Sequence, residues 1–417
     1  MTANATQTLV RSAERNAILS SCCGVLGEVA LTDSAVILLF AGMLGAGARL
    51  SLMTTSLLPL LNGLCIVPMA AVAAHVGARR LTLDASALAG VAYFAAAAAP
   101  WFGHSAATVL LVSIFCFSLF LSGFVAGWFP LLDTFLARER RVAFFARMRL
   151  CHQAVCVAFL FAVGLLIGRC PQVGHVQAVL FASAVIFLGR MAFVSRIPVF
   201  PEVESGGVGL RWGVTSAVSN RRLVGFSLYV FALNLASYGV VPVALLYLKN
   251  RLHAPDNAVV TVSAVALAGM FLGYAGVAAA VRRWKSRGVF RMAHAAFALV
   301  CLSLFCVGKG NFLAYCVMAA VLLVYNFFVA AASVVASSEM LSHADARNKT
   351  MDMAYFGAFF YGGQGLSRLL PSVLMGADAA AVRWRLGGLP VCRYQLVFLL
   401  CAVGATLTAL FLKKEEP

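Results

Sequence analysis

Long apolar segments recur along the whole chain, and short polar stretches separate them. Of the 417 residues, 62% are hydrophobic and only 11% are charged, whereas an ordinary soluble domain carries about 25% charged residues. Because about 20 mostly apolar residues suffice to cross a bilayer, the chain is long enough for roughly a dozen spans. These features exclude a water-soluble fold and predict a polytopic membrane protein.

Apolar runs such as Thr108 to Phe124 lack the alternation of polar and apolar residues that is typical of barrel strands. Since the bilayer core cannot hydrate backbone amides, each run is expected to form a helix. The sequence therefore predicts an all-α membrane protein with about twelve transmembrane helices in two six-helix halves. The predicted spans cover residues 16–41, 52–74, 82–101, 106–132, 150–169, 175–196, 222–247, 257–281, 289–308, 311–337, 351–375 and 393–412.

Lys and Arg gather in short clusters between the apolar segments, and the two sides of the membrane receive unequal shares. With an even number of spans, 22 of the 32 basic residues, Arg149 among them, fall on the side of the termini and eight on the other. Loops rich in Lys and Arg face the cytoplasm, so both termini are expected there. Since this topogenic pattern accounts for the net charge of +17, nucleic acid is not an expected partner.

The longest interruption of the apolar pattern contains two prolines and a pair of glycines, and it divides the spans into two groups of six. We expect an N-terminal half at 1–196, a cytoplasmic linker at 197–221 and a C-terminal half at 222–417. The stretch RWGVTSAVSNRR at 211–222 closes this interruption and could lie as a helix at the membrane surface.

A basic segment follows the second span of each half. The first, AAVAAHVGARR at 70–80, contains Gly77, Arg79 and Arg80, and the second is RRWKSRG at 282–288. Their matching places form a weak internal repeat, as expected when two parallel six-span halves build one membrane protein.

Another basic segment follows the fourth span, where TrpPhePro at 128–130 precedes ARERRVAFFARMR at 137–149. Together with the segment at 70–80, it resembles the corresponding loops of the major facilitator superfamily, and the resemblance covers nearly the full chain. The acidic residue usual in the first of these loops is missing here. The residues that the resemblance assigns to gating loops are Gly77, Arg79, Arg80, Asp133, Arg140, Arg141 and Arg147.

The resemblance implies a secondary active transporter that moves a small solute by alternating access. It further implies a monomer in the lipid bilayer of the bacterial cytoplasmic (inner) membrane, with no cofactor. None of the motifs names a substrate, because one fold hosts many solutes and the cavity decides among them.

Ionisable residues within spans are the best pointers to function, because an unpaired charge is costly in hydrocarbon. Glu28 and Asp33 lie in the first predicted span, five residues apart and on different faces of the helix. A carboxylate removed from water favours its neutral form and can exchange protons. Asp33, or else Glu28, is therefore a candidate proton-coupling or cation site. Alternatively, one of them pairs with a buried arginine or caps a break at Thr32 to Ser34.

Arg368 lies in the eleventh predicted span, close to Gln364, and two interpretations of it are equally open. It could bind an anionic group of a solute in a bidentate manner, or it could be the fixed partner of a carboxylate in the first span. Arg190, near the end of the sixth span, is expected to extend to the lipid headgroups.

By the resemblance, the first, fourth, seventh and tenth spans line a cavity of moderate polarity. Each polar residue there could contact the solute or could instead join neighbouring helices. The candidates on the last three of these spans are Ser118, Ser122, Asn234, Tyr238, Tyr325 and Asn326.

Other function classes have less support in the sequence. There is no GxxxxGK[ST] loop for ATP hydrolysis and no HExxH motif, and the seven histidines are scattered. The twelve cysteines show no metal-binding spacing, so neither a metal site nor a catalytic residue is predicted. A proton-coupled symporter for a small nutrient and an exporter of amphipathic or cationic compounds remain open, as do a non-transporting sensor and an integral membrane enzyme.

Overall fold

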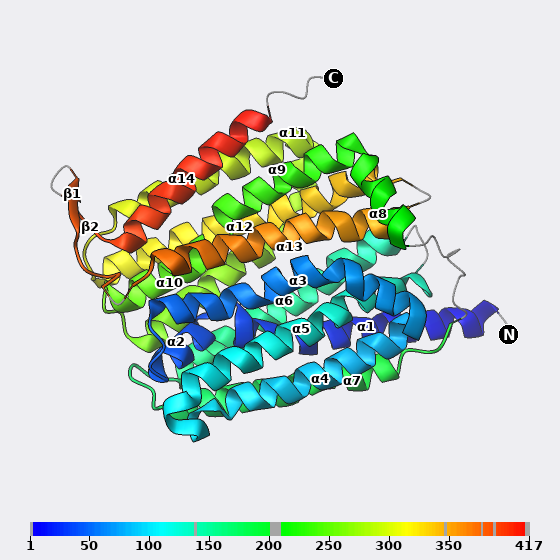
Figure 1. Cartoon of the computed structure of the whole chain (residues 1–417), viewed down its shortest axis with the longest axis horizontal. Coiled ribbons are helices and arrows are strands. Elements are labelled where there is room, and N and C mark those ends of the chain that lie inside the picture. The colour runs from blue at the N-terminus through cyan, green and yellow to red at the C-terminus, as the bar shows by residue number, and fades with distance from the viewer. Residues whose placement is uncertain are drawn as a thin grey trace.

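A computed structural model of the chain describes residues 3–136, 140–200, 210–345, 348–376, 378–386 and 389–412. In this part of the chain the first group of six spans is built from helices that run back and forth along one axis (Figure 1). Its elements are α1 Ala3–Thr32, α2 Ala35–Met43, α3 Ala48–Val76, α4 Ala78–Ala97, the 3₁₀ helix η1 Ala99–Ser105, α5 Ala106–Asp133, α6 Arg141–Leu166 and α7 Val173–Ser195.

The second group of six spans follows the short helix α8, and α14 ends it. Within the described ranges, eight helices of the chain are each long and apolar enough to cross a bilayer, or nine if the bent pair α1 and α2 is one span. The elements of this group are α8 Leu210–Ser219, α9 Arg221–Ser237, α10 Val240–Asn250, α11 Asp256–Cys306, α12 Phe312–His343, α13 Lys349–Leu374, β1 Trp384–Leu386, β2 Leu389–Val391 and α14 Arg393–Phe411.

The predicted fold class is confirmed, because every predicted span overlaps one of these helices and the two groups of six are present. The surface helix predicted at 211–222 corresponds to α8 and the start of α9. Helix α11 covers two predicted spans, and its backbone turns at Lys285, where φ is 57° and ψ is 171°. The exact boundaries of the two halves, at 196/197 and 221/222, stay a prediction.

The first span of each group is broken near its middle. Helices α1 and α2 meet at an angle of 41° across Asp33 and Ser34. The hydroxyl of Thr32 donates to the carbonyl of Glu28 (2.7 Å), and the first amide of α2, that of Ala35, donates to Ser263 of α11 (3.3 Å). Helices α9 and α10 are also separated, around Gly239, at a point that the sequence did not indicate, but together they form one span from Arg221 to Asn250.

The two groups pack against each other mainly through α3 with α13 and α6 with α11. Close approach at the first contact depends on glycine. A Cβ on Gly63 of α3 would lie 2.6 Å from the backbone nitrogen of Gly362, and one on Gly365 would lie 2.6 Å from the backbone of Leu60. Small residues of this kind let helix backbones meet directly within a membrane.

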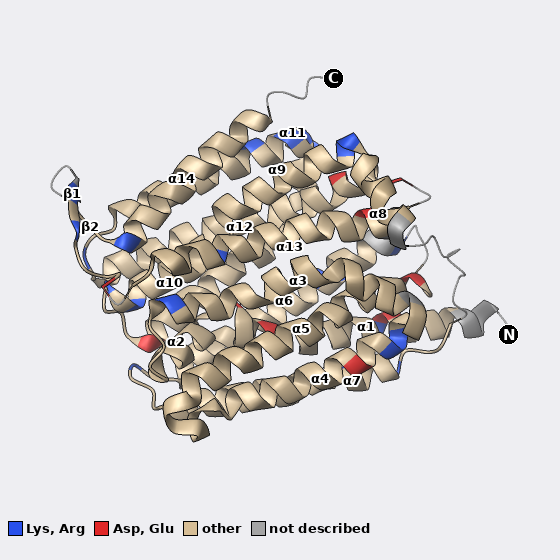
Figure 2. Ribbon diagram, in the orientation of Figure 1, with Lys and Arg blue, Asp and Glu red and all other residues tan. Residues whose placement is uncertain are grey.

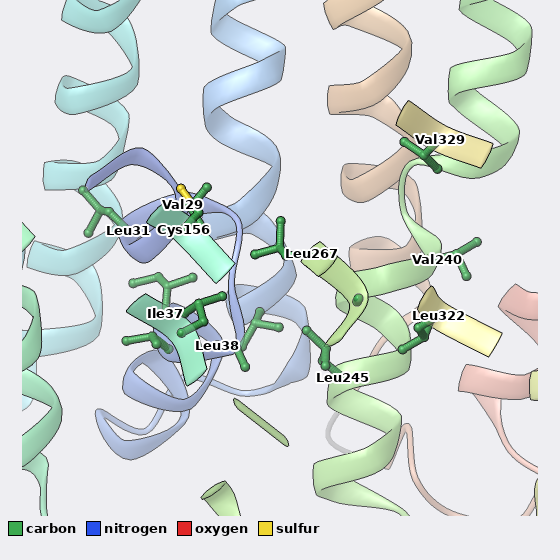
Figure 3. Close-up of a cluster of buried hydrophobic side chains, with 14 of the residues drawn as sticks. Val29, Leu31, Ile37, Leu38, Cys156, Val240, Leu245, Leu267, Leu322 and Val329 are labelled. Atoms are coloured by element: carbon green, nitrogen blue, oxygen red, sulfur yellow. The ribbon is translucent and has the colours of Figure 1, made fainter. Parts of the chain in front are cut away.

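One end of the bundle is closed by two short apolar helices. Residues 35–41 of α2 are all buried, and so are Pro242 to Leu248 of α10. The two helices contact each other across the groups. Figure 3 shows Ile37 and Leu38 of α2 in one apolar cluster with Leu245 of α10. A helix that is apolar on all faces is expected where every face is covered.

Charged residues gather at the two ends of the bundle, and few lie between them (Figure 2). The short antiparallel hairpin of β1 and β2 stands at the end that carries α2 and α10. Helix α1 begins at the other end, and α14 runs toward that end (Figure 1). Long apolar helices of this number and arrangement make the chain a multi-pass membrane protein.

Candidate functional site

The break between α1 and α2 carries a carboxylate into the middle of the bundle. Asp33 forms an ion pair with Arg368 of α13, with 2.6 Å between Oδ1 and Nη2. The other terminal nitrogen of Arg368 donates to the carbonyl of Thr55 on α3 (3.0 Å). Of the two interpretations of Arg368, the structure therefore shows the ion pair with a first-span acid. This pair joins the two groups of helices.

The two partners differ in exposure. The Arg368 side chain is 6% exposed, whereas that of Asp33 is 45% exposed although it lies at a mid-span break. Asp33 therefore faces open space inside the bundle. Because Arg368 keeps its charge at all ordinary pH values, Asp33 is the partner of this pair that can bind and release a proton.

Glu28 of α1 pairs with Arg190 of α7. The expectation that Arg190 extends to the headgroups is wrong, because its side chain is only 1% exposed. Its guanidinium carbon lies 3.9 Å from the ring centroid of Phe124 and 5.0 Å from that of Phe187. Two aromatic faces and a carboxylate therefore replace water around this cation.

Gly24 makes this arrangement possible. A Cβ at that position would lie 1.8 Å from Nε and Nη2 of Arg190, so the guanidinium lies directly on the α1 backbone. Only glycine leaves that space. Nε and Nη1 of Arg190 are buried, and no acceptor lies within hydrogen-bonding distance of them among the described residues.

A third arginine, which the charge distribution had assigned to the cytoplasmic side, lies against the same interior region. The guanidinium carbon of Arg149 on α6 lies 5.7 Å from the ring centroid of Tyr274 on α11. Sequence reasoning missed Arg149 and Tyr274.

The polar residues predicted to line a cavity are mostly buried between helices. Asn234 donates to the carbonyl of Phe360 (3.0 Å), and Tyr325 donates to that of Ser237 (2.6 Å). The hydroxyl of Ser122 donates to the carbonyl of Leu119 in its own helix (2.6 Å). These three side chains contribute to packing in the structure, and their contact with a solute stays a prediction.

The remaining predicted residues fall into two groups. Ser118, Asn326 and Gln364 are buried, and no described acceptor or donor partners the Ser118 hydroxyl or Gln364 Nε2. Tyr238 is half-buried, and the guanidinium carbon of Arg368 lies 5.6 Å from its ring centroid. Tyr238 and Asn234 line a small cavity of about 10 Å³, which has room for about one water molecule.

The residues predicted to act in the fourth-to-fifth gating loop meet an acid of α1. Glu14 is 6% exposed, and its Oε2 lies 3.0 Å from Nη2 of Arg140 and 3.5 Å from Nη2 of Arg147. These pairs lie within the first group of helices. Asp133 is exposed at the end of α5, and the side chain of Arg141 lies outside the described part of the structure.

The other predicted gating residues surround the turn between α3 and α4. Gly77 has a φ of 87°, which explains glycine at this turn. Arg79 donates to the carbonyl of Ser195 (2.7 Å), and Arg80 forms an exposed pair with Asp84 (3.7 Å). The turn borders a surface groove of about 310 Å³. A gating role for these residues stays a prediction.

Comparison with known proteins places these features in a recognised architecture. No family model matches the sequence, and no curated protein matches it. The structure is similar to that of the nucleoside transporter NupG, at 12% identity over 98% of this chain and 100% of that chain, with a TM-score of 0.70. In the described part of the chain, no group of three His, Cys, Asp or Glu is placed to hold a metal ion.

Two further solved structures agree with this comparison. The human organic anion transporter MFSD10 aligns at 14% identity over 97% of this chain and 99% of that chain, with a TM-score of 0.67. The major facilitator superfamily transporter FucP, in its outward conformation, aligns at 12% identity over 98% of both chains, with a TM-score of 0.62. The protein therefore has the fold of the major facilitator superfamily.

Proposed function

We propose that the protein is a secondary active transporter that moves a small solute by alternating access and couples this movement to protons at Asp33. The neighbours in fold are named as transporters of nucleosides, of organic anions and, for one FucP structure, of fucose with protons. Their substrates differ, so they support the class of function and not a particular solute.

The ion pair between Asp33 and Arg368 carries this proposal. It joins the break in the first span of one group to α13 of the other, and its acid faces open interior space. When a proton neutralises Asp33, the ion-pair attraction across the groups is lost, whereas the hydrogen bond from Arg368 to the carbonyl of Thr55 remains. Proton binding would therefore weaken one connection between the groups, which is what coupling to a rocking motion requires.

The proposal includes a bacterial cytoplasmic membrane, a monomer and cytoplasmic termini. The excess of basic residues at the side of the termini supports this orientation. The end closed by α2 and α10 is then the external one, and the Glu14 cluster with Arg140 and Arg147 is cytoplasmic. We assign to that cluster the gating role suggested by the sequence.

The test begins with melting temperatures of the purified full-length chain, at two pH values, with nucleosides, sugars, amino acids, organic anions and organic cations. A ligand at 100 times its Kd stabilises by about 2.7 kcal/mol, which is readily measured. Uptake of the ligand that binds is then followed in proteoliposomes with and without a pH gradient.

Asp33→Asn should abolish accumulation driven by the pH gradient and retain exchange of solute across the membrane. The matched control is Asp378→Asn, which removes an acid with a 44% exposed side chain outside the interior and outside the predicted gating loops. Unchanged pH-driven accumulation in Asp33→Asn would exclude coupling at this residue. No movement of any binding solute by well-folded protein would refute the transporter itself.

A further inference from the structure

The interior region contains more positive than negative charge. Three arginines lie there, and two of them are matched by carboxylates, because Arg190 pairs with Glu28 and Arg368 with Asp33. Arg149 forms no ion pair with any acid of the described residues. One cation is therefore left without a compensating charge.

Arg149 belongs to the interior and not to the cytoplasmic loop. Helix α6 begins at Arg141, so Arg149 lies eight residues, or about 12 Å, into the helix. Four residues further along, Gln153 is 4% exposed and donates to the carbonyl of Leu267 on α11 (3.2 Å). The face of α6 that carries Arg149 therefore packs on α11 of the other group.

The surroundings of Arg149 suit a planar ligand that carries a negative charge. Tyr274 lies nearby from α11, and its side chain is only half-buried. It offers a ring face and a hydroxyl donor.

An uncompensated arginine cannot reduce its cost by losing a proton, because guanidinium stays charged in proteins. Its terminal nitrogens present a fork that matches a carboxylate. Arg368 is less available, since its two terminal nitrogens already donate to Asp33 and Thr55. Arg149 is thus the interior cation best able to receive an anion from outside the protein.

We propose that the solute is a small organic anion whose carboxylate binds Arg149 and whose planar body lies against Tyr274. This inference rests on the proposed transport function and names the class of its substrate. The anion supplies the charge that the chain itself lacks at this position.

The test uses three sets of probes with one ring and different charge. Benzoate and nicotinate are the anions, benzamide and nicotinamide are the neutral partners, and benzylamine is the cation. Binding to the full-length chain in detergent is measured by melting temperature and by calorimetric titration. The anions should bind at least tenfold more tightly than their neutral partners, and benzylamine should not bind.

Arg149→Gln should weaken binding of the anions at least tenfold and should leave the neutral amides unaffected. Arg149→Lys should restore part of the loss. The matched control is Arg291→Gln, which removes the same charge from an exposed position of α11 and should leave anion binding unchanged. Calorimetry on variants with unchanged melting temperature separates loss of the site from loss of the fold.

The proposal is wrong if the anions bind no better than their neutral partners, or if Arg149→Gln binds them as the unmodified chain does. Transport of a neutral or cationic solute that depends on Asp33 would refute the proposal that the substrate is an anion, and it would leave the proposed transport function standing. Anion binding that depends on Arg149, without movement in proteoliposomes, would support the site and refute transport.

Discussion

The pair of Glu28 and Arg190 gives the sharpest prediction of stability. The Arg190 side chain is 1% exposed and that of Glu28 is 23% exposed, so the cation of the pair is removed from water. Replacing Glu28 with Gln leaves a cation against Phe124 and Phe187 without its counterion. Loss of one partner from a buried pair costs about 3–5 kcal/mol, and we expect a destabilisation of this size from Glu28→Gln.

The double variant Glu28→Gln with Arg190→Met should recover most of that loss. It removes both charges, and methionine packs well against the two aromatic rings. Replacing a whole buried pair with apolar groups is often neutral or stabilising. The double variant should therefore be more stable than Glu28→Gln alone, and a double-mutant cycle should show strong coupling between the two positions.

Unfolding in mixed micelles, followed by tryptophan fluorescence as dodecyl sulfate is added, measures these free energies. The exposed pair of Arg80 and Asp84 is the matched control, and its removal should change stability by no more than about 1 kcal/mol. If the effects of Glu28→Gln and Arg190→Met simply add, the two side chains do not form the buried pair, and the argument fails.

Three further predictions follow from contacts described above. Gly63→Ala should destabilise the chain by about 1–3 kcal/mol, because the added Cβ would overlap the α13 backbone. The control is Gly225→Ala, whose Cβ would meet open space. It should be neutral or slightly stabilising in the same micelle titration. The hydrogen bond from Arg383 lowers the pKa of Asp378, so this contact stabilises the hairpin at pH values above the ordinary carboxyl range and is lost as pH falls through the lowered value. Protection factors of the hairpin amides, corrected for intrinsic exchange, should be constant near neutral pH and fall only in acid; a fall near pH 7 would contradict the assignment. In intact cells an impermeant maleimide should modify the exposed Cys170, since the loop that carries it lies at the end opposite the termini. Modification only after permeabilisation would show that the protein has the opposite orientation in the membrane.

The number and order of the spans could be predicted because each is a long apolar run that must satisfy its own backbone. The break after Thr32 was one alternative suggested by the residues there. The break around Gly239 carries no comparable local signal, because its amide is satisfied by Ser367, 128 residues away (2.7 Å). The hairpin was missed because its strands are only three residues long.

The candidate site was predicted only in part, because contacts with distant segments are again involved. The sequence shows how deep a residue lies along a span, but it does not show which side chains of other helices the residue contacts. Arg190 was therefore assigned to the headgroups, although Phe124 and Glu28 from other helices surround it. Arg149 followed a run of basic loop residues and was grouped with them, because the start of α6 at Arg141 could not be fixed from composition.

The buried stretch of α2 also limits how a proton can reach Asp33. Its seven consecutive buried residues, Ala35 to Ala41, are all apolar, and they form a dry segment about 10 Å long. A proton has no polar side chain to follow through such a segment, so it insulates Asp33 from the compartment beyond. A charge carried across the whole membrane exchanges about 2.3 kcal/mol with the field per 100 mV.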